Sequence, residues 1–152
     1  MPLVIDLQVA ADVEQVVPPQ GKFQLWADAA ASACANIKNE LSIRVVGFQE
    51  SAEFNLKYRK KEGPTNVLSF PFEDPPGVLT DVMGDLLICA PVVLQEADEQ
   101  GKTAEQHWAH MLVHGVLHLC GYDHLKTAEA EEMEALETRI LVDLGYPQPY
   151  DE

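Results

Sequence analysis

Three histidines at fixed spacing are the residues of this sequence best suited to chemistry. His114 and His118 stand four residues apart, so on a helix their imidazoles lie on one face about one turn from each other. Gly121 follows, where a helix can end in a left-handed residue that glycine adopts without strain, and the returning chain can bring His124 toward the same point. Three nitrogen ligands leave a tetrahedral ion one position for water. The spacing predicts a catalytic metal site; all-imidazole ligands favour zinc, with nickel or copper as substitutes.

One position separates this pattern from the long metalloprotease signature H-E-x-x-H-x-x-G-x-x-H. Where that signature carries a glutamate, this chain has Gly115. The ligand spacing is therefore present and the protease's general base is absent, although the attacking water still has to lose a proton. This pattern disfavours peptide hydrolysis and leaves open a hydrolase whose substrate brings its own charge.

The neighbouring polar residues allow several roles. Cys120 could be the fourth ligand of a structural zinc, but it lies two residues after His118, about 200° round the helix, which favours a core thiol. Asp123 could be a weak ligand, a partner for a ligand imidazole or a base that orients water. His107 and His110 share the histidine stripe, and supporting or structural roles suit them better than binding the ion.

Charge is distributed unevenly along the chain. The net charge is −15, from 25 acidic and 10 basic residues, which argues against broad binding of polyanions. Four of the basic residues nevertheless fall within residues 57–61, as Lys57, Arg59, Lys60 and Lys61. The cluster is either a solvated end of a helix, where cations suit the helix dipole, or a local clamp for an anion.

Composition indicates a globular protein, with 152 residues expected to form one domain over 1–152 and 47% hydrophobic residues. Three scattered cysteines give no disulfide framework and suit a reducing compartment. The N-terminus has no signal-peptide pattern, and no apolar run reaches the roughly 20 residues of a membrane helix. We therefore expect a cytoplasmic protein that does not contact the membrane.

The hydrophobic pattern predicts strands alternating with helices. A capping box, Thr103 with Gln106, is expected to open the histidine helix. Pro71 suggests an edge strand or a strand end. The expected fold is an α/β sandwich with a small mixed, mostly parallel four-stranded sheet and about five to six helices. The predicted strands are 3–9, 41–48, 66–72 and 85–89, and the predicted helices are 22–37, 51–60, 91–100, a helix from 103, and 128–144.

Several segments together resemble the YbeY family of bacterial metal-dependent endoribonucleases. They are Tyr58-Arg59, PTNVLSFPF at 64–72, Gly84-Asp85 and HGVLHLCGYDH at 114–124. The resemblance implies an α/β fold with zinc held by His114, His118 and His124. It implies a single-strand-specific ribonuclease that matures the 3′ end of 16S ribosomal RNA and acts in late ribosome quality control. It also implies that Arg59 lies near the metal and engages phosphate, as a guanidinium group can do with two oxygens.

The resulting hypothesis is metal-assisted hydrolysis of a phosphodiester. Arg59 would neutralise the phosphate, and Asp123 is the candidate general base; attack by the RNA 2′-hydroxyl would lessen the need for a base. Because the chain is acidic, we expect it to reach the small ribosomal subunit through a ribosomal protein or an assembly GTPase. The alternatives are a metallopeptidase-like hydrolase and a ribosome-assembly factor with a structural zinc.

Overall fold

A mixed four-stranded sheet forms the centre of the protein. The computed structural model describes residues 2–34, 38–122 and 127–150. The strand order is β1-β2-β4-β3; β1 pairs with β2 and β2 with β4 in parallel, and β3 pairs with β4 antiparallel. This confirms the predicted mixed, mostly parallel sheet. The strands are β1 (Val4–Val9), β2 (Glu40–Val46), β3 (Val67–Pro71) and β4 (Val82–Cys89).

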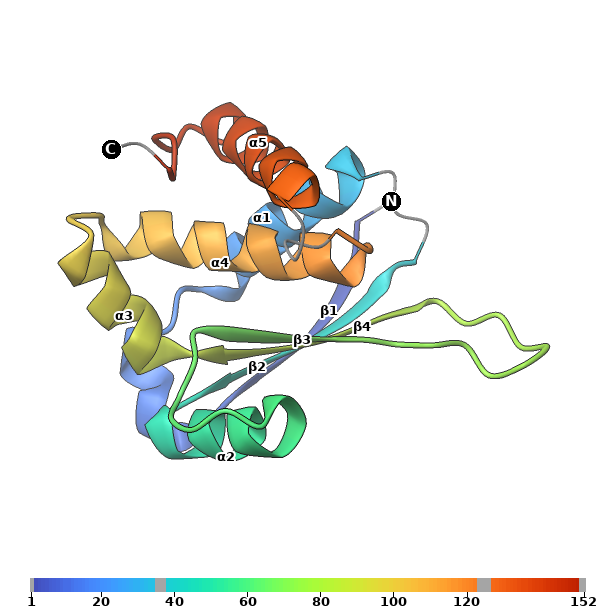
Figure 1. The fold of residues 1–152 in the computed structure, drawn as a ribbon, viewed down its shortest axis with the longest axis horizontal. Helices are drawn as coiled ribbons and strands as arrows, with labels where there is room; N and C mark the ends of the chain where they lie inside the picture. Colours follow the sequence, from blue (N-terminus) through green and yellow to red (C-terminus); the bar gives the residue numbers. More distant parts are fainter. Residues whose placement is uncertain (1, 35–37, 123–126, 151–152) are drawn as a thin grey trace.

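Helices cover the sheet unequally (Figure 1). Helix α2 lies on one face, while α1 and α4 lie on the other, and α5 packs on the outer side of α1 and α4. The described residues form six helices, as expected: η1 (Ala11–Val16), α1 (Gln20–Ala33), α2 (Phe48–Arg59), α3 (Ala90–Glu99), α4 (Ala104–Leu119) and α5 (Thr127–Asp143). None of these helices is long and apolar enough to cross a bilayer, in the ranges that the structure describes.

Several boundaries differ from the sequence predictions, and one short helix was not predicted. The second strand, predicted over 41–48, ends at Val46 because the carbonyl of Gly47 already accepts the first backbone hydrogen bond of α2. Strand β4 begins at Val82 rather than 85, because it pairs with β2 as far as Val82, opposite Glu40, and with β3 as far as Gly84, opposite Pro71. Helix α1, predicted to reach 37, ends at Ala33, and 35–37 lie outside the described residues. The short helix η1 was not predicted.

Pro71 ends β3, which is an edge strand of the sheet, as its missing amide hydrogen predicted. Strand β4 lies between β2 and β3 and has no edge exposed. Helix α4 contacts both β3 and β4, so it lies over the β3 edge of the sheet.

Helix α4 is held at both ends and along its length. At its start, the Thr103 hydroxyl accepts from the Gln106 amide at 3.1 Å and the Gln106 side chain accepts from the Thr103 amide at 3.0 Å, which confirms the capping box. At its end, Gly121 has φ 100°, and Tyr122 N donates to Leu117 O at 3.1 Å. Along its length, α4 contacts α1, α3, α5 and the sheet. Side chains on α4 are thus carried by a rigid element of the core.

Candidate active site

Four histidines form a stripe along α4 that runs from the protein interior to the surface. Successive ring centroids lie 6.0, 6.3 and 4.7 Å apart, from His107 through His110 and His114 to His118. His107 and His110 are buried, with 2% and 7% exposure, whereas His114 and His118 are half-buried. Only the C-terminal pair can therefore meet a solvent-borne ligand without rearrangement.

Glu137 of α5 holds two of these histidines from behind. Its carboxylate is fully buried and accepts from His110 Nε2 at 2.6 Å, from His114 Nδ1 at 2.9 Å and from the Tyr150 hydroxyl at 2.6 Å. Burial would raise the pKa of Glu137, but these hydrogen bonds outweigh it and lower the pKa to about 2. Glu137 is thus ionised at neutral pH, and each neighbour has to donate a proton to it.

The carboxylate fixes the tautomer of His114. Because Nδ1–H donates to Glu137, the neutral ring carries its lone pair on Nε2, the form of imidazole that a metal ion binds. Metal-binding histidines usually donate their other ring nitrogen to such a carboxylate. The donor chemistry at His114 therefore fits a resident metal ion.

A second carboxylate network anchors the buried end of the stripe. Glu96 of α3 accepts from His107 Nε2 at 2.8 Å and from the Asn66 side-chain amide at 3.1 and 3.3 Å. Burial lowers the pKa of His107 despite the opposing effect of Glu96. His107 is consequently a neutral structural donor, in agreement with the supporting role predicted for it.

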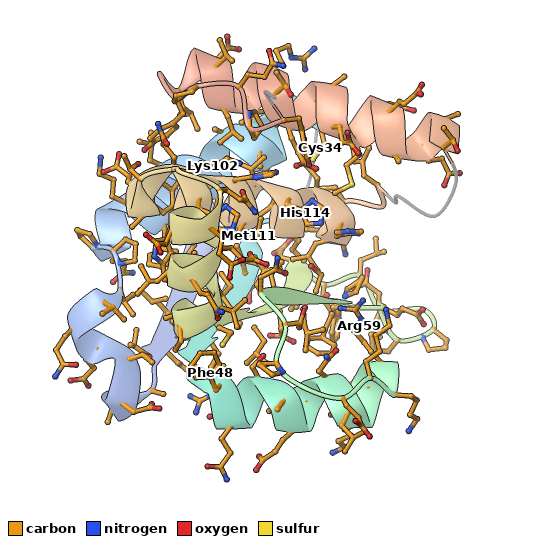
Figure 2. The ribbon with its side chains drawn as sticks, turned by 60° about the vertical axis from the view of Figure 1, so that its left-hand side comes forward. Cys34, Phe48, Arg59, Lys102, Met111 and His114 are labelled. Carbon is orange, nitrogen blue, oxygen red and sulfur yellow. The ribbon has the colours of Figure 1, made fainter. Side chains whose placement is uncertain are left out.

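A cleft of about 680 Å³ lies beside the exposed end of the stripe. Arg59, the last residue of α2, lines the same cleft as His114 and His118. Its side chain is exposed and has no hydrogen-bond or ion-pair partner within the described ranges. Figure 2 shows His114 coming from α4 and Arg59 from α2 on the same part of the molecule. The other lining residues come from the end of α2 and from β3 and the segment before it: Tyr58, Thr65, Asn66, Val67, Leu68, Ser69 and Phe70.

Gly115 occupies the contact between α4 and the sheet. A Cβ at this position would lie 2.8 Å from Leu86 Cδ2 and 3.4 Å from Val67 Cγ2. A glutamate at 115 would therefore clash with Leu86 of the sheet. The absence of the protease's general base follows from the close packing of helix on sheet.

The predicted site residues are only partly described. His114, His118 and Arg59 line one cleft, whereas Asp123 and His124 lie outside the described residues. Among the residues that the structure describes, no three metal-ligating side chains converge. The three-histidine ligand set and the role of Asp123 therefore stay predictions.

Two carboxylates and one thiol contact were not predicted from the sequence. Glu137 could have been found, because it is an acid on the inward apolar stripe of α5 that Met133, Ile140 and Leu141 define. Glu96 gave no such signal. Cys120, predicted to be a core thiol, is half-buried at the end of α4, and its sulfur lies 2.7 Å from that of Cys34.

Comparison with known proteins bears on both fold and activity. The solution structure of TM1509 from Thermotoga maritima resembles this one with a TM-score of 0.56 over 98% of this chain and 100% of that one. At 19% sequence identity this likeness speaks for the fold alone. Residues 11–145 match the family described as "Endoribonuclease YbeY", which is generally metal-dependent. The chain belongs to the YbeY family, and membership implies an endoribonuclease that acts in ribosomal RNA maturation.

Proposed function

We propose that the protein is a zinc-dependent endoribonuclease specific for single strands, with the ion held by His114, His118 and His124. Its substrate is the 3′ end of 16S ribosomal RNA, and it acts in late ribosome quality control. The observation that carries the proposal is the shared cleft, in which the unpartnered Arg59 faces the same space as His114, whose Nδ1 is occupied by Glu137.

Each residue of the proposed site has one role. Arg59 binds the phosphate oxygens and neutralises the charge that grows on them in the transition state. Glu137 holds the His114 ring in one tautomer and one orientation through a hydrogen bond of 2.9 Å. Zinc, when bound, supplies a Lewis acid at the phosphodiester. Asp123 is proposed as the general base.

The charge of the chain decides how it meets its substrate. A protein with net charge −15 binds free RNA weakly, and more weakly as salt rises. We propose that a ribosomal protein or an assembly GTPase of the small subunit supplies most of the affinity in the cytoplasm. The exposed cations at the end of α2 then act locally on the strand that enters the cleft.

Charge reversal at Arg59 tests this function. Purified Arg59→Glu protein should lose at least about 100-fold in cleavage of single-stranded RNA. Arg59→Lys should lose about tenfold, because an ammonium group cannot bind phosphate with a planar fork. The matched control is Lys61→Glu, which makes the same charge change at an exposed neighbour that does not line the cleft.

The same assay separates the alternatives. Zinc-loaded protein should cleave single strands and spare matched duplexes, and chelated protein should cleave neither. Equal loss in Lys61→Glu and Arg59→Glu would contradict a specific phosphate contact. A chelated protein that unfolds would instead indicate an assembly factor with a structural zinc. A 2′,3′-cyclic phosphate on the product would indicate attack by the RNA itself, and a plain monoester would indicate attack by water.

A further inference from the structure

Two cysteines from distant parts of the chain meet at the end of the histidine helix. Cys34 is the residue that caps α1, and Cys120 caps α4, 86 positions later in the sequence. The Cys34 thiol donates to Cys120 Sγ across 2.7 Å. Both residues are present as thiols. A covalent disulfide bond measures about 2.05 Å. The two sulfurs therefore have to move only a short distance toward each other to form one.

The two helices that carry these thiols are rigid neighbours. Helix α1 packs on α4, and its inward residues Trp26, Ala27 and Ala30 are fully buried. Phe23 of α1 contacts Trp108 of α4 edge to face, with ring centroids 5.8 Å apart. Because the core holds both helices in place, the sulfurs meet without a rearrangement of the fold.

The pair lies at a surface hollow that a small molecule can enter. The hollow measures about 540 Å³ and is lined by Cys34, Cys120, Gly121, Tyr122, Glu129 and Glu132. Its two glutamates repel anionic oxidants such as a glutathione disulfide, whereas a neutral peroxide meets no such barrier. The third cysteine, Cys89, is buried in β4 with 1% exposure, and it does not line this hollow.

We propose that Cys34 and Cys120 form a redox-active dithiol, which hydrogen peroxide converts reversibly into a disulfide. One thiol, as its thiolate, attacks a peroxide oxygen and becomes a sulfenic acid, with release of one water. The second sulfur then attacks the sulfenic sulfur and expels a second water. In total, the two thiols lose two protons and two electrons, and these reduce one peroxide to two waters.

The bond would tie the segment after His118 to the end of α1. Closing so long a loop restricts the unfolded chain, so the oxidised protein should melt about 5–15 °C higher than the reduced one.

Peptide mass spectrometry of the full chain tests the proposal. Reduced protein is treated with hydrogen peroxide, blocked with an alkylating reagent and digested. A peptide pair that joins Cys34 to Cys120, lighter by two hydrogens and separated again by dithiothreitol, is the expected result. Cys89→Ser should form the same pair and show the same rise in melting temperature. Cys34→Ser should show neither, while its reduced form melts within about 2 °C of the reduced wild type.

Three results would overturn the proposal. They are a cross-link that involves Cys89, oxidation of Cys34 and Cys120 to separate sulfinic acids, and a disulfide formed only between molecules. An unchanged melting temperature of the oxidised wild type would equally contradict a covalent link between α1 and α4. None of these measurements depends on RNA cleavage or on zinc, so their outcome is independent of the proposed function.

Discussion

The two halves of the α4 histidine stripe consist of the same residue type, three residues apart in His107 and His110 and four apart in His114 and His118, yet they have different roles. His107 and His110 are buried, and carboxylates of α3 and α5 accept from their Nε2 atoms at 2.8 and 2.6 Å. His114 donates from its other nitrogen, Nδ1, to the same carboxylate that holds His110. His114 and His118 border the cleft.

The buried and open histidines use different ring nitrogens to contact their carboxylates, and this difference matches their different roles. In the buried half, Nε2 makes a hydrogen bond, and Nδ1 is buried without a partner among the residues that the structure describes. In the open half, His114 uses Nδ1 against Glu137 and keeps Nε2 on the other side of the ring. Glu137 joins the halves, because one carboxylate oxygen serves His110 and the other serves His114. The buried half can therefore support the open half without contacting a ligand.

Removal of an imidazole from the open half should have the largest effect. His114→Ala is expected to lower RNA cleavage by at least about 10³-fold, because a metal ligand is lost. Its free energy of unfolding should fall by only about 1–2 kcal/mol, since Glu137 loses one of three donors. Cleavage assays and urea titrations of the same preparations measure both quantities.

The matched control lies in the buried half. His107→Gln keeps a nitrogen donor for Glu96 and should retain cleavage within about threefold. If His107→Gln lost as much activity as His114→Ala, the distinction between the halves would be wrong.

Glu137→Gln should weaken both halves together. Its amide group places a donor against nitrogens that already donate, so we expect zinc affinity to fall about 10- to 100-fold. The free energy of unfolding should fall by about 2–4 kcal/mol, because a buried hydrogen-bonded charge is replaced by a mismatched neutral group. Competition with a chelating dye and urea titration provide the two values. Glu134→Gln, on an exposed turn of the same helix, should change neither.

Gly115→Ala tests the packing that places the stripe over the sheet. The added Cβ would meet Leu86, which is 1% exposed, and we expect a net loss of about 1 kcal/mol after the gain in helix propensity. Gly21→Ala in α1 is the matched control, because a Cβ there would meet no atom of the described residues within 4 Å, and this substitution should stabilise the protein. Equal stabilisation by both substitutions, in thermal unfolding, would show that the helix is not closely packed at 115.

The smallest expected effect is a pH dependence that belongs to the buried half. Burial lowers the pKa of His107 below its usual value near 6.5, with the charges of His110 and Lys102 acting in the same direction and Glu96 opposing them. The unfolded chain therefore takes up a proton first as pH falls below about 6.5, and the native state loses stability. Urea titrations of chelated protein between pH 8 and pH 5 should show a shallower decline for His107→Gln. Parallel profiles of wild type and variant would assign the dependence to other groups.

The α/β architecture and the elements that carry the site were determined by local sequence patterns. Alternating apolar residues, a continuous apolar run and turn signals between segments predicted the four strands, and the Thr103–Gln106 pair and Gly121 predicted where α4 begins and ends. Such signals can be read from the sequence because they depend on interactions within one turn or one strand. The spacing of His114 and His118 likewise determined that both share one face of α4.

Tertiary structure alone decided which histidines are buried and which carboxylates hold them. Helical spacing places all four on one stripe, but only the packing of α3 and α5 brings Glu96 and Glu137 to it. The meeting of Arg59 with the histidine cleft and of Cys34 with Cys120 also joins segments far apart in sequence. No local pattern encodes such contacts, because each depends on the relative placement of whole elements around the sheet.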